Sequence, residues 1–186
     1  MTDAIIDRRD LPGVVVEFGC FKGGSTAKLS LACAYAGKQL RVFDSFEGLP
    51  EPKAWDAEHQ IERKRIFRRG EYAGSLEEVT ANVRRHGDLS VCDFRQGWFA
   101  ETLHGFAEPV SVAFVDVDLV ESTDQVISAI WPLVVRGGVL YVHDATDEKL
   151  QSLLQPERFP GASESFVPAR GDIPTLRTKT LAWFAC

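Results

Sequence analysis

Two apolar segments of the sequence each end in side chains that could bind a cation or move a proton. Residues 110–118 read Val-Ser-Val-Ala-Phe-Val-Asp-Val-Asp, so an apolar run ends in Asp116 and Asp118. Residues 139–142 form another apolar run, which ends in His143 and Asp144. In a strand that extends so far, Asp116 and Asp118 would point to the same side. Carboxylate and imidazole groups that converge could hold a divalent cation, or they could be hydrogen-bonding partners around a polar cleft.

A glycine-rich turn near the N-terminus could hold a small polar ligand. Residues 14–18, Val-Val-Val-Glu-Phe, are typical of a buried strand of a parallel sheet. Gly19, Gly23 and Gly24 follow, and Ser25 leads into a helical segment. This arrangement can hold a ligand against backbone N–H groups, or it can be a plain connection whose glycines serve packing. Its spacing, G-x-x-x-G-G, differs from the G-x-G-x-x-G of dinucleotide-binding proteins.

Two further groups are expected at the same edge of the sheet. Asp44 follows an apolar segment about 25 residues after Gly19, near the separation of about 20 at which an acidic residue meets a ribose in open α/β sites. Asp44 could otherwise cap a turn. Gly97 and Trp98 follow another strand-like segment, where an aromatic ring could flank an adenine or simply pack. Because parallel strands end at one edge, these groups predict a single ligand site.

The order of segments predicts an α/β fold with a Rossmann-like, doubly wound and mostly parallel sheet. Ser75 and Ser122 each begin an S-x-x-E/Q pattern and are expected as helix N-caps, and Gly137-Gly138 is expected to end the helix after Ser122. The expected strands are residues 14–18, 40–43, 90–95, 110–118, 139–142, 165–169 and 180–185, and the expected helices are residues 24–36, 75–85, 123–134 and 147–154.

The 186 residues are expected to form one domain, with an N-terminal arm at residues 1–12, a mobile lid at residues 44–74 and an exposed turn at residues 171–174. The net charge of −6 argues against binding along a nucleic acid backbone, which requires a basic surface. The basic cluster at residues 63–69 is expected to be a solvated face, with a substrate-facing role as the alternative.

The remaining composition indicates a protein of the cytoplasm that does not enter membranes. No apolar run approaches the length of a membrane span. The four cysteines lie far apart without metal-ligand spacing, which is typical of thiols in a reducing compartment.

Five blocks together resemble the macrocin O-methyltransferase family, which belongs to the class I S-adenosylmethionine (SAM)-dependent methyltransferases. The most specific block is Asp-Ser-Phe-Glu-Gly-Leu-Pro at residues 44–50. The other blocks are residues 15–25, Tyr72 with residues 75–79, residues 97–103, and residues 115–144 with their acidic and glycine positions. The resemblance implies a seven-stranded sheet with an antiparallel last strand, and methyl transfer from SAM to a hydroxyl of a small-molecule acceptor, often the sugar of a natural product.

The resemblance also implies a site. Mg²⁺ would be held by Asp116, His143 and Asp144. Asp116 could also serve as the catalytic base. Without a metal, His143 is the better candidate for the catalytic base, because the unperturbed pKa of histidine lies near neutrality. The family has an acid at the position of His143, so this residue departs from its pattern. The resemblance implies a SAM site formed by Glu17, Gly19, Cys20, Phe21, Gly23, Ser25, Asp44, Ser45, Gly97, Trp98 and Asp116.

Alternatives remain at this stage. Family members usually carry N-terminal helices that cover the substrate and build a dimer, whereas this sequence reaches its first strand almost at once, so a homodimer stays an open expectation. The chain could instead be a non-catalytic SAM- or nucleotide-binding regulatory subunit. An NAD-dependent oxidoreductase is disfavoured because the dinucleotide fingerprint is absent.

Overall fold

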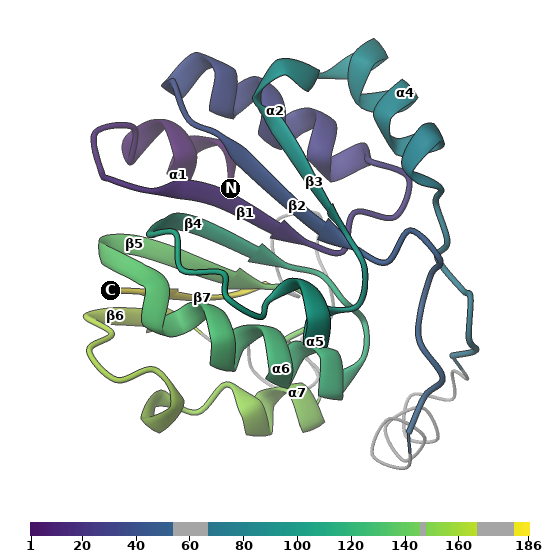
Figure 1. Ribbon diagram of the computed structural model, residues 1–186. Coiled ribbons are helices and arrows are strands. Elements are labelled where there is room, and N and C mark those ends of the chain that lie inside the picture. The colour runs from purple at the N-terminus through teal and green to yellow at the C-terminus, as the bar shows by residue number, and fades with distance from the viewer. Residues whose placement is uncertain (54–66, 146–147, 167–180) are drawn as a thin grey trace.

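A seven-stranded sheet with strand order β3-β2-β1-β4-β5-β7-β6 forms the centre of the protein (Figure 1). It is seen in a computed structural model that describes residues 1–53, 67–145, 148–166 and 181–186. Strands β1 to β5 are parallel, and β7 runs antiparallel to both β5 and β6. This confirms the predicted mostly parallel sheet with a reversed last strand. The strands are β1 (Val14–Phe18), β2 (Leu40–Asp44), β3 (Cys92–Gln96), β4 (Val110–Val115), β5 (Val134–Val142), β6 (Glu164–Phe166) and β7 (Ala182–Ala185).

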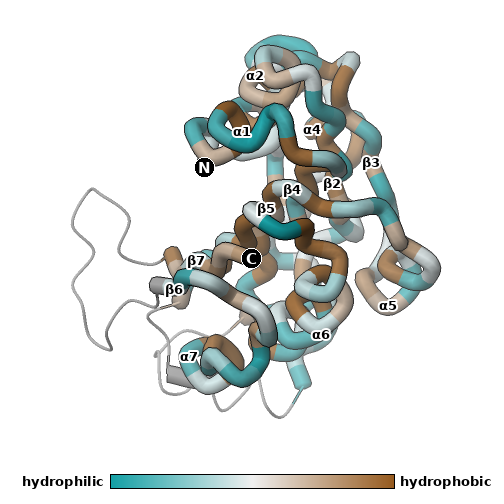
Figure 2. Tube along the Cα trace, turned by 90° about the vertical axis from the view of Figure 1, so that its left-hand side faces the viewer, coloured by the Kyte–Doolittle hydropathy of each residue, from teal (hydrophilic) through white to brown (hydrophobic). Residues whose placement is uncertain are grey.

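Helices cover both faces of the sheet, and Figure 2 shows the strands between the two layers. One layer contains α1 (Thr2–Asp7), α2 (Gly24–Ala36) and α4 (Leu76–His86), and the other contains α5 (Phe99–Thr102), α6 (Val120–Ile130) and α7 (Glu148–Leu153). Side chains alternate between the layers along β1. Val16 and Phe18 pack with residues of α6, whereas Val15 packs with residues of α2.

Several local predictions are confirmed. Strand β1 and helix α2 have the predicted bounds, and α2 ends at Gly37 in a left-handed conformation with φ of 67°. The hydroxyl of Ser75 accepts a 3.1 Å hydrogen bond from the backbone nitrogen of Glu78 at the start of α4. The segment expected as an N-terminal arm contains α1, which buries Ala4 and Ile5 in the α2 layer.

The predicted N-cap at Ser122 is wrong. Helix α6 already begins at Val120, with Leu119 as its N-cap and without a side-chain capping bond, so Ser122 lies inside the first turn. The chain turns earlier than expected because β4 ends at Val115 and Asp118 takes a left-handed φ of 59°. Leu119 and Val120 are buried, and their burial holds the start of the helix against the apolar core.

The expectation that Gly137-Gly138 ends a helix is also wrong, because both glycines lie within β5. The pairing of β5 with β4 is irregular: Val110 faces Val134, whereas Val112 faces Val139. Gly137 has a φ of 83° inside this irregular stretch, a conformation that glycine adopts without strain. Strand β5 is therefore longer than predicted and starts at Val134.

The two sides of the predicted lid are described, but its middle is not. Leu49 and Phe67 form a small apolar cluster with Leu119, and the backbone of Leu49 exchanges hydrogen bonds with Gly70 and Glu71. Residues 54–66, which include basic residues 63–65, and the turn predicted at residues 171–174 lie outside the described residues. Within the described part of the chain, no helix has the length and apolar character to cross a membrane.

Candidate active site

A cavity of about 640 Å³ opens at the carboxyl edge of the parallel strands. This volume lies within the range of about 300–1,000 Å³ that is usual for small-molecule sites. Loops that follow five strands meet there, as predicted from the order of the segments. The lining residues include Gly19, Cys20, Phe21, Gly24 and Ser25 after β1; Asp44 and Ser45 at the end of β2; Gly97 and Trp98 after β3; residues 116–119 after β4; and His143 and Asp144 after β5.

The glycine turn after β1 brings the backbone close to the next loop. Gly19 has a φ of 81°, and a Cβ on it would lie 1.9 Å from the carbonyl oxygen of Asp116. Gly23 is the N-cap of α2, and no side chain caps this helix end within the described residues. Because the first N–H groups of a helix lack partners inside the helix, the N-terminus of α2 can receive a negatively charged ligand group.

Asp44 ties this turn to the loop after β2. Its Oδ2 accepts a 2.7 Å hydrogen bond from the backbone nitrogen of Cys20, and its Oδ1 accepts a 2.8 Å bond from that of Phe46. Its own backbone oxygen accepts a 3.0 Å bond from the nitrogen of Gly97. Three loops of the cavity are therefore held together by one residue.

Two residues predicted for the SAM site lie behind the cavity wall. Gly23 packs against Val79, to which an added Cβ would approach within 3.1 Å. Glu17 is fully buried in β1 and is not part of the cavity lining. Ser45 does line the cavity, but its hydroxyl donates to the carbonyl of Gly48 at 2.8 Å and so closes the turn after β2.

The burial of Glu17 changes its acidity. Burial raises the pKa of Glu17 to about 7, the hydroxyls of Ser25 and Thr26 lower the pKa in part, and the charges of Asp116 and Asp44 raise it further. Neither carboxylate oxygen makes a hydrogen bond of good geometry to any described residue. Ionising a fully buried carboxyl group is costly even with two hydroxyl groups near it, so the raised pKa follows from its position.

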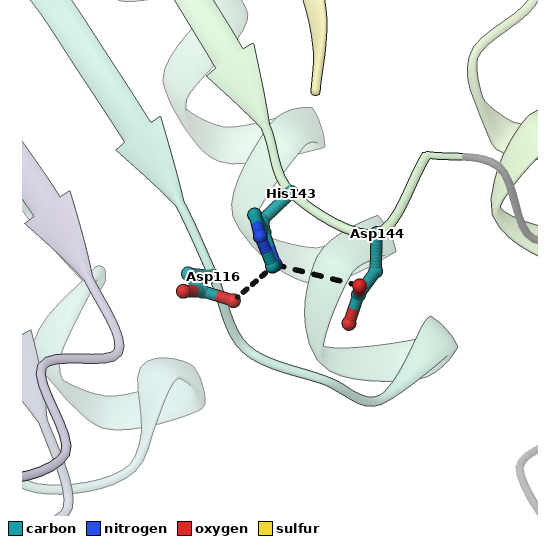
Figure 3. Close-up of side chains that lie close together, drawn as sticks. All are labelled: Asp116, His143 and Asp144. Carbon is teal, nitrogen blue, oxygen red and sulfur yellow. Dashed lines mark ion pairs between the residues drawn. The ribbon is translucent and has the colours of Figure 1, made fainter. Parts of the chain in front are cut away.

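Asp116, His143 and Asp144 also line the cavity, and their side chains converge, as Figure 3 shows. The Nδ1 of His143 lies 3.0 Å from an oxygen of Asp116 and 3.5 Å from an oxygen of Asp144. These contacts are ion pairs rather than well-directed hydrogen bonds. The carboxylate of Asp116, followed by that of Asp144, raises the pKa of His143 to about 10, against the effect of burial.

Asp118 does not share this cluster. The strand predicted over residues 110–118 is wrong in its extent, so the condition under which Asp116 and Asp118 would point to the same side is not met. Strand β4 ends at Val115, before either aspartate, and the left-handed backbone of Asp118 redirects the chain. Asp118 still lines the cavity. Among the described residues, the group that could offer ligand atoms within 4.8 Å of one another consists of Asp116, His143 and Asp144.

Unusual backbone conformations gather around the cavity. Five non-glycine residues of the described chain have a positive φ: Phe21, Phe46, Tyr72, Asp118 and Asp144. Four of them line the cavity, and Phe46 follows the lining residue Ser45. A positive φ is uncommon for aromatic residues, and such strain collects at functional sites.

Sequence reasoning missed part of the cavity wall. Tyr72 was not among the predicted site residues, yet it lines the cavity and forms an edge-to-face pair at 5.6 Å with Phe21, which was predicted. Glu121 and Gln125 of α6 also line the cavity. They were not predicted because the capping pattern at Ser122 placed the start of the helix later than Val120. A signal was present in the apolar residues Leu119 and Val120, which are suited to a buried helix start.

Comparison with known proteins decides the family. Residues 2–155 match the macrocin-O-methyltransferase (TylF) family over most of the chain. This chain belongs to that family. The 8-demethyl-8-(2,3-dimethoxy-alpha-L-rhamnosyl)-tetracenomycin-C 4'-O-methyltransferase of Streptomyces olivaceus is 35% identical over 141 residues, which cover 72% of this chain and 53% of that protein. Demethyldecarbamoylnovobiocin O-methyltransferase of Streptomyces niveus is 31% identical over 73% of this chain and 53% of its own length.

The solved structure of the O-methyltransferase NovP has a TM-score of 0.77 to this TylF-family chain, with 25% identity, and covers 99% of this chain and 76% of NovP. The calicheamicin methyltransferase CalS11 has a TM-score of 0.70 at 18% identity, and this likeness supports the fold alone. The TylF-family chain spans about half the length of the curated relatives that it matches.

Proposed function

We propose that this TylF-family protein transfers a methyl group from SAM to a hydroxyl group of a small molecule, such as a sugar carried by a natural product. The observation that carries the proposal is the family match together with one cavity that joins the glycine turn to the Asp116, His143 and Asp144 cluster. The relatives are named as O-methyltransferases of a rhamnosyl-tetracenomycin and of demethyldecarbamoylnovobiocin. The acceptor class proposed here follows from these names and from the size of the cavity.

The cavity has features that fit SAM near the glycine turn. The uncapped N-terminus of α2, beside Gly24 and Ser25, suits the carboxylate of a methionine group. Asp44 lies where a carboxylate can accept bonds from ribose hydroxyls, and Trp98 offers an aromatic surface beside them. When bound, SAM supplies a methyl group on a positively charged sulfur. Gly19, Cys20, Phe21, Ser45 and Gly97 would shape the remaining wall.

The acceptor would then lie toward Asp116 and His143. Its hydroxyl oxygen forms a bond to the methyl carbon as the carbon–sulfur bond breaks, and its proton must go to a base. Asp116 is the proposed base because it lines the cavity as a carboxylate. His143 is less suited to this role, since its pKa of about 10 keeps it protonated at neutral pH.

The family resemblance implies Mg²⁺, but the residues here do not fit that ion. Mg²⁺ requires near-octahedral oxygen ligands, and imidazole nitrogen suits transition metals instead. The nitrogen of His143 already lies between the two carboxylates, at 3.0 and 3.5 Å. The mechanism proposed for this protein therefore does not use Mg²⁺.

Calorimetric titration with SAM, S-adenosylhomocysteine and NAD tests the cofactor. We expect binding of the first two and none of NAD. Transfer of labelled methyl from SAM to a panel of rhamnosylated and other glycosylated acceptors tests the reaction. SAM binding without transfer to any hydroxyl acceptor would favour the non-catalytic, regulatory reading, and absence of SAM binding would overturn the proposal.

We propose a single domain over residues 1–186 and binding of a small molecule rather than a nucleic acid, in keeping with the net charge of −6. A homodimer and a cytoplasmic location remain predictions. Sedimentation velocity of the purified chain tests the first of these two.

A further inference from the structure

We propose that the side chain of His143 fills the position that a divalent cation would take between Asp116 and Asp144, so that this protein does not use Mg²⁺. The inference rests on the proposed function only in that it concerns the same cavity. Its test measures metal binding directly and does not depend on methyl transfer.

The imidazole of His143 lies between the carboxylates of Asp116 and Asp144. Its Nδ1 lies 3.0 Å from an Asp116 oxygen and 3.5 Å from an Asp144 oxygen, so one atom contacts a carboxylate from the end of each of two neighbouring strands (Figure 3). A cation shared by Asp116 and Asp144 would be placed in the same space. The imidazole thus joins the two carboxylates that a metal would otherwise join.

The backbone keeps His143 in this place. The backbone nitrogen of His143 donates a 2.8 Å hydrogen bond to the carbonyl oxygen of Val115, which continues the pairing of β5 with β4 beyond the strand ends. The backbone nitrogen of Asp116 is likewise bonded to the carbonyl of Phe18 at 2.9 Å. Both members of the pair are therefore held by the sheet edge rather than by a free loop.

The atoms that this cluster offers to a cation differ from those that Mg²⁺ prefers. With histidine at this position the cluster offers two carboxylates and one nitrogen, whereas aspartate would make it three carboxylates from two strand ends. Mg²⁺ is held by oxygen ligands and gives up its water reluctantly, so exchange of one carboxylate for imidazole removes a ligand that it prefers. The single substitution His143→Asp should therefore create a site that the natural chain lacks.

Calorimetric titration with Mg²⁺, and with Mn²⁺ followed by electron paramagnetic resonance, tests the inference on the purified full chain. The natural protein should show no saturable binding of either ion up to millimolar concentration. His143→Asp should bind both ions saturably, with a dissociation constant at least about tenfold below the highest concentration tested, because its ligand set consists of oxygen atoms alone. His104→Asp is the matched control, since it changes an exposed histidine in the same way.

Two outcomes would overturn the inference. One is saturable binding of Mg²⁺ or Mn²⁺ by the natural protein that is lost in Asp116→Asn. The other is a folded His143→Asp protein, checked by circular dichroism, that binds neither ion. If His143→Asp does not fold, the titration of the natural protein and of Asp116→Asn still decides the question. SAM titration of the same samples reports separately on the proposed cofactor.

Discussion

The Oδ2 atom of Asp44 accepts a 2.7 Å hydrogen bond from the backbone nitrogen of Cys20, which joins the end of β2 to the glycine turn after β1. The other carboxylate oxygen, Oδ1, accepts a 2.8 Å hydrogen bond from the backbone nitrogen of Phe46. One side chain therefore sets the relative position of two loops that line the cavity. Asp44 would serve the cofactor site by organising the turn as well as by contacting the ligand.

Substitution of Asp44 tests this double role. Asp44→Ala leaves two backbone N–H groups without their acceptor, so we expect a loss of stability of about 1.5–3 kcal/mol and at least about tenfold weaker SAM binding. Chemical denaturation and calorimetry measure the two effects. Asp10→Ala, which removes a carboxylate that is 91% exposed, should change neither. Unaltered SAM affinity in Asp44→Ala would contradict the proposed role.

Alanine substitutions at two glycines with positive φ, Gly37 and Gly19, distinguish the cost of backbone strain from the cost of steric crowding. Gly37→Ala places a Cβ in open space at the end of α2, so it should cost about 1 kcal/mol of stability. Gly19→Ala has the same unfavourable φ, but its Cβ would also meet the carbonyl oxygen of Asp116 at 1.9 Å. We expect a larger loss of stability and a loss of SAM binding, by denaturation and calorimetry. Equal effects of the two substitutions would show that crowding at Gly19 is relieved.

The buried Glu17 predicts an unusual dependence of stability on pH. Its pKa is raised from 4.5 to about 7 in the folded protein. Between these values the folded state keeps a proton that the unfolded state has lost, so stability contributed by this group falls as the pH rises. The difference of about 2.5 pKa units corresponds to roughly 3 kcal/mol between pH 4.5 and pH 8.

Glu17→Gln removes this titration with little change of shape. We expect the variant to gain stability over the natural protein progressively from pH 5 to pH 8, as measured by urea denaturation at each pH. Glu157→Gln, at an exposed position, should show no such trend. A pH-independent difference between Glu17→Gln and the natural protein would mean that Glu17 does not titrate in this range.

If Asp116 is the catalytic base, its substitution should impair methyl transfer without weakening SAM binding. Asp116→Asn should lower methyl transfer by about 10²–10⁴-fold, the usual contribution of a general base, and leave SAM affinity within a few-fold. Single-turnover transfer and calorimetry measure these quantities. Asp93→Asn, which changes an aspartate on β3 outside the cavity, is the control. Transfer at the natural rate by Asp116→Asn would remove Asp116 from the mechanism.

Local patterns in the sequence predicted much of the scaffold. The β-branched run of β1 and the glycines after it have the expected bounds, and Ser75 caps α4 as expected, because such features depend on neighbouring residues. The convergence of Asp44, Asp116 and His143 on one edge also followed from the order of parallel strands. The family resemblance added the nature of the reaction.

Other features depended on contacts between distant segments. Gly137 and Gly138 lie within β5 because the pairing of β4 with β5 is irregular at this point. Helix α6 begins before the expected cap at Ser122 because Leu119 is buried at its start. Glu17, expected at the cofactor, lies beneath the turn because alternate residues of β1 face opposite layers.

The sequence by itself determined which chemical groups reach the edge of the sheet. The order of strands and helices along the chain follows from local patterns, and crossover connections bring the carboxyl ends of parallel strands to one edge. Only the tertiary structure decided that Asp118 is separate from the cluster and that Nδ1 of His143 lies between Asp116 and Asp144. These outcomes depend on where each strand stops and how its last residues turn. Both are set by packing and hydrogen bonding across the sheet, between residues that are far apart in the chain.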